Sequence, residues 1–436
     1  MSFIEQIIEL SQMQVNQISP KAIKLAQYSL LDWLICGFGG TNEPLANKLR
    51  IFAKNEAGAE VASIFGGFKA PARMAALVNG ATSHALDYDD THFGHIGHLS
   101  VAIYPAALAV GEECRKSAKE VVEAFVIGAE VAIRIGINLG SGHYNHGYHQ
   151  TATSGAFGAT VAAGRLYGLT KQQMRNAIGL CSTRASGLKS QFGTMGKPYN
   201  AGISAINGVE CAQLAALDFI SSNDGLMGPH GFCATHGFDL KSKLPALPNP
   251  SQMFLFEDNK YKLHACCHGL HAMIEALKSN DLTGLTLDEI GSVLIFTHSK
   301  WLLVCDKKEP QSGLETKFSY AWLAGMTLRA DDTGNDKNYT DGLTRDPQLV
   351  QFSNKVRVVA SHELTDMQVK VTVTLKNGKE IHVAHDLSIP VPLEILREKL
   401  QKKAFSVIGD KGKQLWNSLE EIEDLSAMDI GQMILN

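Results

Sequence analysis

The feature that most constrains the fold is a succession of helix-patterned segments, rich in alanine and glycine, between residues 20 and 219. Apolar residues recur there at helical spacing, and small residues occupy more than one face. Helices with small residues all round can approach several neighbours closely, so the pattern predicts a buried helical bundle. The expected helices span residues 20–38, 68–87, 100–115, 118–139, 152–166, 170–188 and 200–219.

The pattern changes in the second half of the chain, where residues 368–375 alternate polar and apolar side chains. Asn377-Gly378 then predicts a two-residue hairpin turn into a further strand at 380–384. Further strands are expected at 293–297 and 356–359, with a helix at 314–327. We therefore predict a mainly α protein: a large all-helical domain (1–257), an inserted smaller α+β lid domain (258–392) and a helical return (393–436).

Charge and composition exclude several classes of function. The formal net charge is −4, so the chain has no basic field for nucleic acid or an anionic membrane. No run of about 18 uncharged apolar residues is present, and the N-terminus reads as an amphipathic helix. Eight cysteines without a paired CxxC pattern indicate reduced thiols. We expect a cytoplasmic protein with no nucleic-acid partner and no membrane partner.

Residues 84–100 combine three carboxylates, four imidazoles and two hydroxyls between two apolar helical segments. Glycines at 94 and 97 disfavour a continuous helix, so this segment is expected to be a loop. Such a loop can direct acids, bases and hydrogen-bond donors at one small anionic ligand, which indicates proton-transfer chemistry. The structural alternative is that the histidines are core or capping residues, and that Asp89 and Asp90 cap the next helix.

Other segments also place polar groups in apolar surroundings. Residues 143–153 precede a helix, whose N-terminus could bind a carboxylate. Lys197 stands on a glycine-rich loop that suits carboxylate binding better than nucleotide binding, although a solvated surface lysine is the simple alternative. Residues 262–271 bring a lysine, two thiols and three imidazoles together, and the thiols could equally be packed in the core. Residues 315–320 open a helix and supply the phenol of Tyr320.

Metal binding is the main alternative chemistry, because histidines repeat every third residue at 92, 95 and 98 and again at 143, 146 and 149. This spacing is not the i, i+4 pairing of a helical zinc site, and glycines interrupt it, so we expect no metal. The chain has no Gly-x-Ser-x-Gly elbow, dinucleotide fingerprint or phosphate loop. No organic cofactor is therefore expected.

Five motifs occur in order along the chain. They are Asn79-Gly80 with His84-Ala-Leu-Asp87-Tyr-Asp-Asp-Thr91 and His98-Leu-Ser100, His149-Gln-Thr-Ala-Thr, Gly193-Thr-Met-Gly-Lys197-Pro, Lys262 to His271, and Lys317-Phe-Ser-Tyr320. Together they resemble the MmgE/PrpD family, which includes 2-methylcitrate dehydratase, cis-aconitate decarboxylase and iminodisuccinate epimerase. The resemblance covers nearly the whole chain and implies a large helical domain with a smaller α+β lid, a homodimer and no metal.

The resemblance implies active-site roles for Asp87, Thr91, His98, His149, Lys197, Lys262 and Tyr320. The two lysines would bind substrate carboxylates and stabilise enolate-like charge. His98 or His149 would transfer the proton, Asp87 would orient a neighbouring imidazole, and Thr91 and Tyr320 would hydrogen-bond substrate oxygens. Cys267 stands where a decarboxylase histidine is expected, with His268 one position later, and both are expected to contact substrate. The histidine loop is also one residue longer before His98.

The predicted function is a lyase that moves a proton next to a carboxylate of a small di- or tricarboxylic acid. Loss of water would make it resemble the dehydratase, and loss of carbon dioxide the decarboxylase. Epimerisation of an iminodisuccinate-like dicarboxylate is the first alternative. A non-catalytic ligand-binding protein on the same fold is the second.

Overall fold

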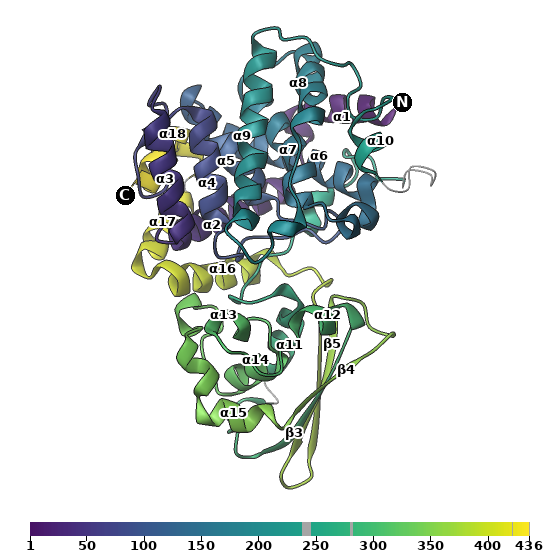
Figure 1. Ribbon diagram of the computed structural model, residues 1–436, viewed down its shortest axis with the longest axis vertical. Helices are drawn as coiled ribbons and strands as arrows, with labels where there is room; N and C mark the ends of the chain where they lie inside the picture. Colours follow the sequence, from purple (N-terminus) through teal and green to yellow (C-terminus); the bar gives the residue numbers. More distant parts are fainter. Residues whose placement is uncertain (238–245, 280–281, 421, 436) are drawn as a thin grey trace. The chain divides into compact units, whose positions relative to one another are not determined.

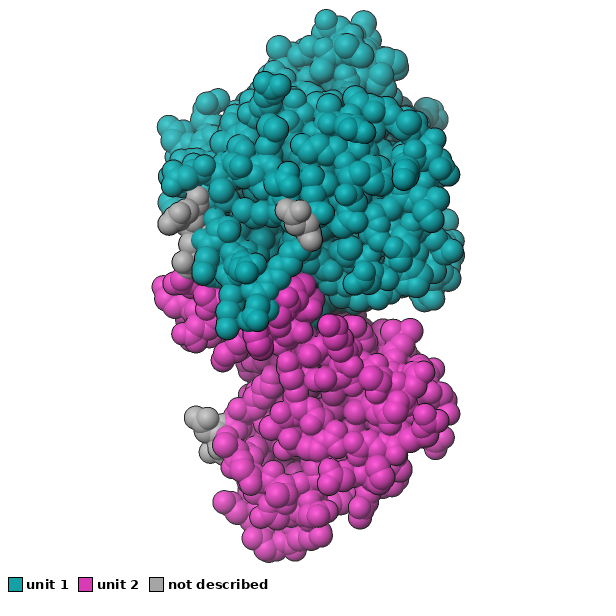
Figure 2. All heavy atoms as spheres, turned by 90° about the vertical axis from the view of Figure 1, so that its left-hand side faces the viewer, with its two compact units in different colours: residues 1–261, 410–436 teal, residues 262–409 magenta. Residues whose placement is uncertain are grey.

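The computed structural model describes residues 1–237, 246–279, 282–420 and 422–435 (Figure 1). The chain divides into two compact units, coloured separately in Figure 2: unit 1 comprises residues 1–261 and 410–436, and unit 2 comprises residues 262–409. The sequence analysis placed these boundaries at 257/258 and 392/393. The difference arises because helix α16 (Leu393–Ile408), expected to return to the helical domain, groups with unit 2.

The regular structure described in unit 1 is helical apart from a short two-stranded ribbon of β1 (Ala62–Ser63) and β2 (Lys69–Ala70). The mainly α class predicted from sequence is confirmed. Helices α4, α5, α6, α7 and α9 pack against one another at the centre of the unit (Figure 1). The helices are α1 (Phe3–Ser11), α2 (Pro20–Gly40), α3 (Pro44–Glu56), α4 (Ala72–Ser83), α5 (Ser100–Glu113), α6 (Ala118–His146), α7 (Gln150–Leu166), α8 (Lys171–Arg184), α9 (Gly196–Ala216), α10 (Phe232–His236), α17 (Asp410–Glu420) and α18 (Ala427–Leu435).

Glycines set the closest helix crossings of this bundle. A Cβ added at Gly128 of α6 would lie 2.5 Å from the Gly158 carbonyl oxygen of α7, and one at Gly158 would lie 2.6 Å from the Gly128 carbonyl oxygen. Between α4 and α9, a Cβ at Gly202 would lie 2.4 Å from the Leu77 carbonyl oxygen. Larger residues at these positions would push the backbones apart, which is why the small residues in the pattern correspond to a closely packed bundle.

Helix ends near the polar segments differ from the predicted ends. α4 stops at Ser83 rather than 87, and the chain then reverses at Asp87, whose φ is 50°. α6 continues to His146, past a break at Gly140 where φ is 66°. α9 begins at Gly196, four residues earlier than expected, which places Lys197 in its first turn. These shifts decide which polar residues lie in loops and which lie on helices.

Unit 2 contains a four-stranded sheet in the order β4-β3-β5-β6. β3 pairs in parallel with β4 and antiparallel with β5, which forms a hairpin with β6. All four predicted strands are present, and the turn at Asn377-Gly378 is found with Gly378 at φ 86°. The strands are β3 (Ile290–Thr297), β4 (Val356–Ala360), β5 (Gln368–Leu375) and β6 (Glu380–Asp386).

One predicted helix of unit 2, at 314–327, is wrong as a single element. The chain forms α13 (Gly313–Thr316) and α14 (Tyr320–Leu328), separated by a turn in which the Ser319 side chain accepts from the Trp322 N–H at 3.4 Å. This N-cap competes with helix continuation. The other helices are α11 (His271–Leu277), α12 (Ser299–Cys305) and α15 (Pro347–Ser353). None of the helices described in either unit is long and apolar enough to cross a membrane.

Candidate active site

The polar loop between α4 and α5 is anchored by the buried carboxylate of Asp90. The N–H and hydroxyl of Ser100, the first residue of α5, donate to Asp90 at 3.0 and 2.7 Å. Ser29 of α2 and Asn259 donate to the same carboxylate at 3.1 and 2.6 Å. Burial raises the pKa of Asp90. Asp90 therefore serves the structural role of holding the start of α5, as the capping alternative predicted, whereas Asp89 does not.

Two of the four loop histidines, His92 and His95, make contacts that stabilise the fold. His92 accepts the His95 N–H at Nδ1 (3.1 Å) and donates from Nε2 to the Leu255 carbonyl (3.0 Å). His95 is fully buried, with Nδ1 3.2 Å from the Ser154 hydroxyl, and burial lowers its pKa to about 3. Because their ring nitrogens are directed at these separate partners, His92 and His95 do not converge with His98 on one point.

His98 belongs to a buried row of side chains in close polar contact, which runs from imidazole to carboxylate to imidazole. Its Nδ1 lies 2.7 Å from Asp89 Oδ2, and the other oxygen of Asp89 lies 2.8 Å from His84 Nδ1. Burial lowers the pKa of His84 to about 4, and the two imidazoles hold the pKa of Asp89 below its usual range despite burial. Asp89 is therefore ionised at neutral pH and accepts a proton-bearing Nδ1 from each histidine.

Asp87 and Lys197 lie on the other side of His98. Asp87 Oδ1 is 3.4 Å from His98 Nε2 and 2.7 Å from Lys197 Nζ. The Asp87 side chain is 41% exposed, compared with 17% for Lys197 and 11% for His98. The loop thus exposes one carboxylate–ammonium pair, Asp87 and Lys197, at the edge of a buried cluster of imidazoles. An anionic ligand could bind Lys197 here by displacing the Asp87 carboxylate.

His149 completes the cluster from the N-terminus of α7. It is 2% exposed, and its ring lies 6.1 Å from the ring of His84 and 5.0 Å from the ring of Phe192. Its Nδ1 is 3.2 Å from Asn200 Nδ2. Burial, followed by the charges of His84, Lys197 and His98, lowers the pKa of His149 well below its usual value, and Asp87 opposes this shift.

Three members of this cluster were not among the predicted site residues: His84, which was considered as one of four clustered histidines, Asp89, which was considered as a helix cap, and Asn200. The sequence analysis assigned the imidazole-orienting role to Asp87, whereas the carboxylate on His98 Nδ1 is that of Asp89. A signal for Asn200 was available, because it follows Lys197 by three residues and so shares its helix face. Thr91 is joined to Lys260 by two backbone hydrogen bonds of 2.7 and 2.8 Å, which fix the middle of the loop.

The remaining predicted site residues belong to unit 2. Tyr320, the first residue of α14, is fully buried. Its hydroxyl donates to the Gly269 carbonyl (3.0 Å) and accepts from Thr297 Oγ1 (3.0 Å). Burial raises its pKa.

The other three lie in the segment that begins unit 2. Lys262 and His268 are 4% and 8% exposed, and the ring of His268 lies 4.6 Å from that of His271. Interaction with the Cys267 side chain, together with burial, raises the pKa of the Cys305 thiol, and all eight cysteines are thiols rather than disulfides. The segment is thus a buried array of a cation, imidazoles and thiols.

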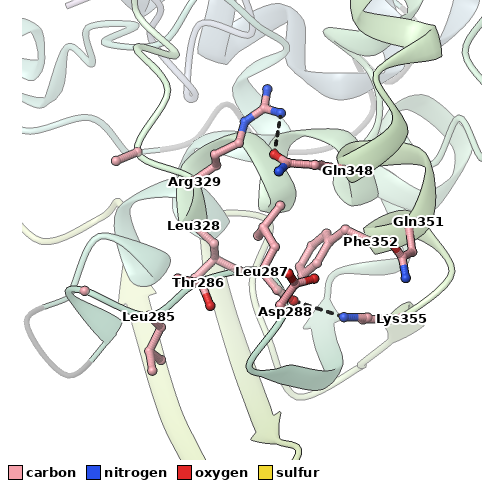
Figure 3. A pocket seen from close by; sticks show the side chains of 12 residues that line it. Leu285, Thr286, Leu287, Asp288, Leu328, Arg329, Gln348, Gln351, Phe352 and Lys355 are labelled. Carbon is pink, nitrogen blue, oxygen red and sulfur yellow. Dashed lines mark hydrogen bonds between the residues drawn. The ribbon is translucent and has the colours of Figure 1, made fainter.

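A separate hollow of about 420 Å³ lies within unit 2 and contains none of these residues (Figure 3). Its two cations are already engaged. Arg329 pairs with Asp331 and Asp346, each at 2.7 Å. Lys355 donates to the Leu287 and Ile290 carbonyls at 3.0 and 2.8 Å. Both cations that line the hollow are therefore already bound to protein groups.

Four side chains of the cluster in unit 1 could hold a metal ion: His84, Asp87, Asp89 and His98 each offer a ligand atom within 4.8 Å of the others. Imidazole and carboxylate ligands suit zinc, iron or manganese. However, the Lys197 ammonium already supplies a positive charge 2.7 Å from Asp87. A divalent ion would have to displace this lysine and the imidazole protons that face Asp89. The four side chains therefore suit the contacts that they make with one another better than they suit a metal ion.

Comparison with known proteins places the chain in a family. Residues 10–242 match the MmgE/PrpD N-terminal domain, and residues 264–422 match the MmgE/PrpD C-terminal domain. The chain belongs to the MmgE/PrpD family, as its motifs indicated. It is 26% identical to a cis-aconitate decarboxylase of Aspergillus terreus, over 95% of this chain and 90% of that protein. It is 23% identical to the cis-aconitate decarboxylase of Homo sapiens, over 95% of this chain and 91% of that protein.

Proposed function

We propose that this protein is a lyase that acts on a small di- or tricarboxylic acid by proton transfer next to a carboxylate. The observation that carries the proposal is the position of His98, bonded through Nδ1 to ionised Asp89 and facing Asp87 and Lys197 through Nε2. A carboxylate on Nδ1 fixes the ring orientation and stabilises the imidazolium, so Nε2 can exchange a proton with substrate. His98 is the proposed proton-transferring group.

Lys197 is proposed to bind a substrate carboxylate in place of Asp87. Its position beside His98 would keep the enolate-like charge that develops in the reaction next to a cation. In decarboxylation, the bond to the departing carboxylate breaks, its electrons enter the enolate, and His98 delivers a proton to carbon. In dehydration, His98 removes the proton from carbon and hydroxide leaves. The names of the relatives favour decarboxylation of a cis-aconitate-like acid; dehydration and epimerisation are the alternatives.

The roles of the unit 2 residues are proposed from the sequence alone. Lys262 would bind a second carboxylate, and Cys267 and His268 would contact substrate. For Tyr320 the sequence implied a hydrogen bond to a substrate oxygen, but its hydroxyl donates to the Gly269 carbonyl, so we propose that it acts through the loop that carries Gly269. Replacing the expected histidine by the smaller, uncharged Cys267 changes the contacts available to the substrate. We therefore propose that the preferred acid differs from cis-aconitate in the group that this position contacts.

The test is incubation of the purified full-length protein with cis-aconitate, 2-methylcitrate and citrate in heavy water. We expect one acid to yield carbon dioxide or a dehydrated product, with solvent deuterium on carbon where a proton is delivered. Absence of both product and deuterium uptake across a wider panel of polycarboxylates would refute the proposal. Recovery of activity by one divalent metal after loss to a chelator would refute the metal-free part of it.

Lys197→Ala separates an enzyme from a non-catalytic binding protein. We expect a loss of turnover of about 10²-fold or more, because one preorganised charge contact is removed. Lys189→Ala is the matched control, since Lys189 lies in the segment that leads into α9 but donates to the Tyr144 carbonyl at 3.1 Å, and it should retain activity. Equal activity of the two variants would contradict the role of Lys197.

A further inference from the structure

We infer that Asn200 holds His149 in the tautomer protonated at Nε2, the opposite of His98, so that His149 is a neutral hydrogen-bond donor to substrate rather than a second base. The inference rests on the proposed function for its catalytic meaning, but the tautomer itself follows from hydrogen-bond geometry. It makes Asn200 a positioning residue, one helical turn after Lys197 on α9.

The orientation of the Asn200 amide is decided by a backbone carbonyl. Asn200 is 3% exposed, and its Nδ2 lies 3.2 Å from the Leu188 carbonyl oxygen. A carbonyl can only accept, so the amide nitrogen, and not its oxygen, is on this side. The same nitrogen lies 3.2 Å from His149 Nδ1, and its second hydrogen is available for that contact. His149 Nδ1 is therefore an acceptor, and the proton of the neutral ring is on Nε2.

The surroundings of His149 oppose a second proton on the ring. Protonation at Nδ1 would bring the new N–H toward the side-chain N–H of Asn200, and two donors facing each other repel. The ring is also desolvated, and Lys197, His84 and His98 lie near it, while the Asp87 carboxylate acts in the opposite direction. These charges lower the pKa of His149 in the same direction as burial does. His149 is thus a neutral imidazole across the working pH range.

His98 has the opposite arrangement. Its Nδ1 lies 2.7 Å from Asp89, and its Nε2 lies 3.4 Å from Asp87, the carboxylate that substrate is proposed to displace. A carboxylate can only accept, so the shorter contact places the proton of the neutral ring on Nδ1 and leaves the lone pair on Nε2. Two histidines in one cluster are therefore held in opposite tautomers by two different partners, Asp89 and Asn200. One can take or give a proton at Nε2, and the other donates a hydrogen bond from Nε2 without changing charge.

Asn200→Asp tests the assignment with little change in shape. A carboxylate at this position would accept from His149 Nδ1, moving the proton to Nδ1 and favouring the imidazolium. We expect turnover to fall by about 10² to 10³-fold at pH 7.5, as when one preorganised donor is removed. Asn207→Asp is the matched control. Asn207 is a buried residue two turns further along α9 whose Nδ2 donates to the Arg184 carbonyl at 2.7 Å rather than to a histidine ring.

Nitrogen-15 spectra of histidine-labelled full-length protein give a readout that does not depend on activity. With His149→Gln used to assign the signal, we expect the wild type to show a neutral ring protonated at Nε2 from pH 6 to 8. The Asn200→Asp variant should show protonation at Nδ1, or a ring that titrates near neutral pH. If that variant does not fold, Asn200→Ala should still show a mixture of tautomers.

A wild-type His149 protonated at Nδ1, or titrating between pH 6 and 8, would overturn the inference. So would an Asn200→Asp variant that is as active as Asn207→Asp. If no polycarboxylate is turned over, the proposed function fails while the spectra still decide the tautomer. The two failures are therefore distinguishable.

Discussion

Replacing Asp89 by Asn tests the central hydrogen-bond network of the site most directly. Asp89 is fully buried and accepts from two imidazoles, at 2.8 Å from His84 and 2.7 Å from His98. An Asn side chain has one acceptor oxygen and one NH₂ donor. One imidazole would keep its acceptor, and the other would face a donor and have to change tautomer.

The expected loss of stability follows from those two hydrogen bonds. Bonds to a charged group contribute about 1.5–3 kcal/mol each, compared with about 0.5–1.5 kcal/mol for neutral ones. Replacing both would therefore cost about 2 kcal/mol, partly offset because a neutral amide is less costly to bury than a carboxylate. We expect Asp89→Asn to lower the free energy of unfolding by about 1–3 kcal/mol at pH 7.

The pH dependence of this difference has a defined sign. The pKa of Asp89 is depressed in the folded protein, so its contribution is present above the pKa of about 3.9 of an unfolded Asp. It is lost as the pH falls through the lower, folded-state pKa. The difference in stability between wild type and Asp89→Asn should thus be constant between about pH 5 and 8 and shrink only below about pH 4.

Urea unfolding at several pH values and turnover of the active substrate are the two assays. Turnover should fall by about 10²–10⁴-fold, because a misoriented His98 loses general acid–base function. Asp90→Asn is the control: Asp90 is also buried but bonds Ser29, Ser100 and Asn259, so its replacement should affect stability while the tautomer of His98 persists. An Asp89→Asn variant within threefold of wild-type turnover would refute the role assigned to this network.

Three further outcomes are expected. Gly158→Ala should lower the free energy of unfolding by about 1–3 kcal/mol, because the new Cβ would lie 2.6 Å from the Gly128 carbonyl oxygen. The cost of this overpacking exceeds the gain of about 1 kcal/mol in helix propensity. An unchanged thermal midpoint would contradict this prediction. Tyr320→Phe should cost about 1–3 kcal/mol by leaving the buried Gly269 carbonyl without its donor, and should lower turnover without unfolding the protein, as measured by urea unfolding and kcat. The free energy of unfolding should fall from pH 7 to pH 5 by about 2 kcal/mol per buried histidine. The reason is that a histidine in the unfolded chain takes up a proton near pH 6.5, whereas the buried one in the folded protein does not. Equal urea midpoints at the two pH values would refute this prediction. The histidines concerned have pKa values lowered to about 4 or 3, and are His84, His95, His143 and His264.

Much of the architecture could be predicted from local pattern. The helical bundle follows from small apolar residues at helical spacing, and the Gly128–Gly158 contact shows why small residues were needed there. The alternation at 368–375 and the Asn377-Gly378 turn likewise specify a hairpin, because strand faces and turn conformation depend on neighbouring residues only. The polar segment at 84–100 was identified as a loop for the same reason: glycines and polar residues interrupt the helical period.

Which residue each carboxylate of that loop binds could be learned only from the tertiary structure. Asp87, Asp89 and Asp90 are equivalent in composition, yet one pairs with Lys197, one binds two imidazoles and one anchors α5. The backbone reverses at Asp87 and again at Ile96, with φ values of 50° and 56°, and these reversals send neighbouring side chains to different partners. Periodicity cannot distinguish them, because a loop has no repeating geometry.

The tertiary structure also decided the chemistry of the two histidines. The sequence by itself determined that imidazoles, carboxylates and a lysine are available, and its motifs indicated the family. Which ring nitrogen carries a proton was decided by contacts from segments far apart in the chain, such as Asn200 on His149. A tautomer is set by the atom that faces each ring nitrogen, and only the packing of α7 against α9 brings that atom into place.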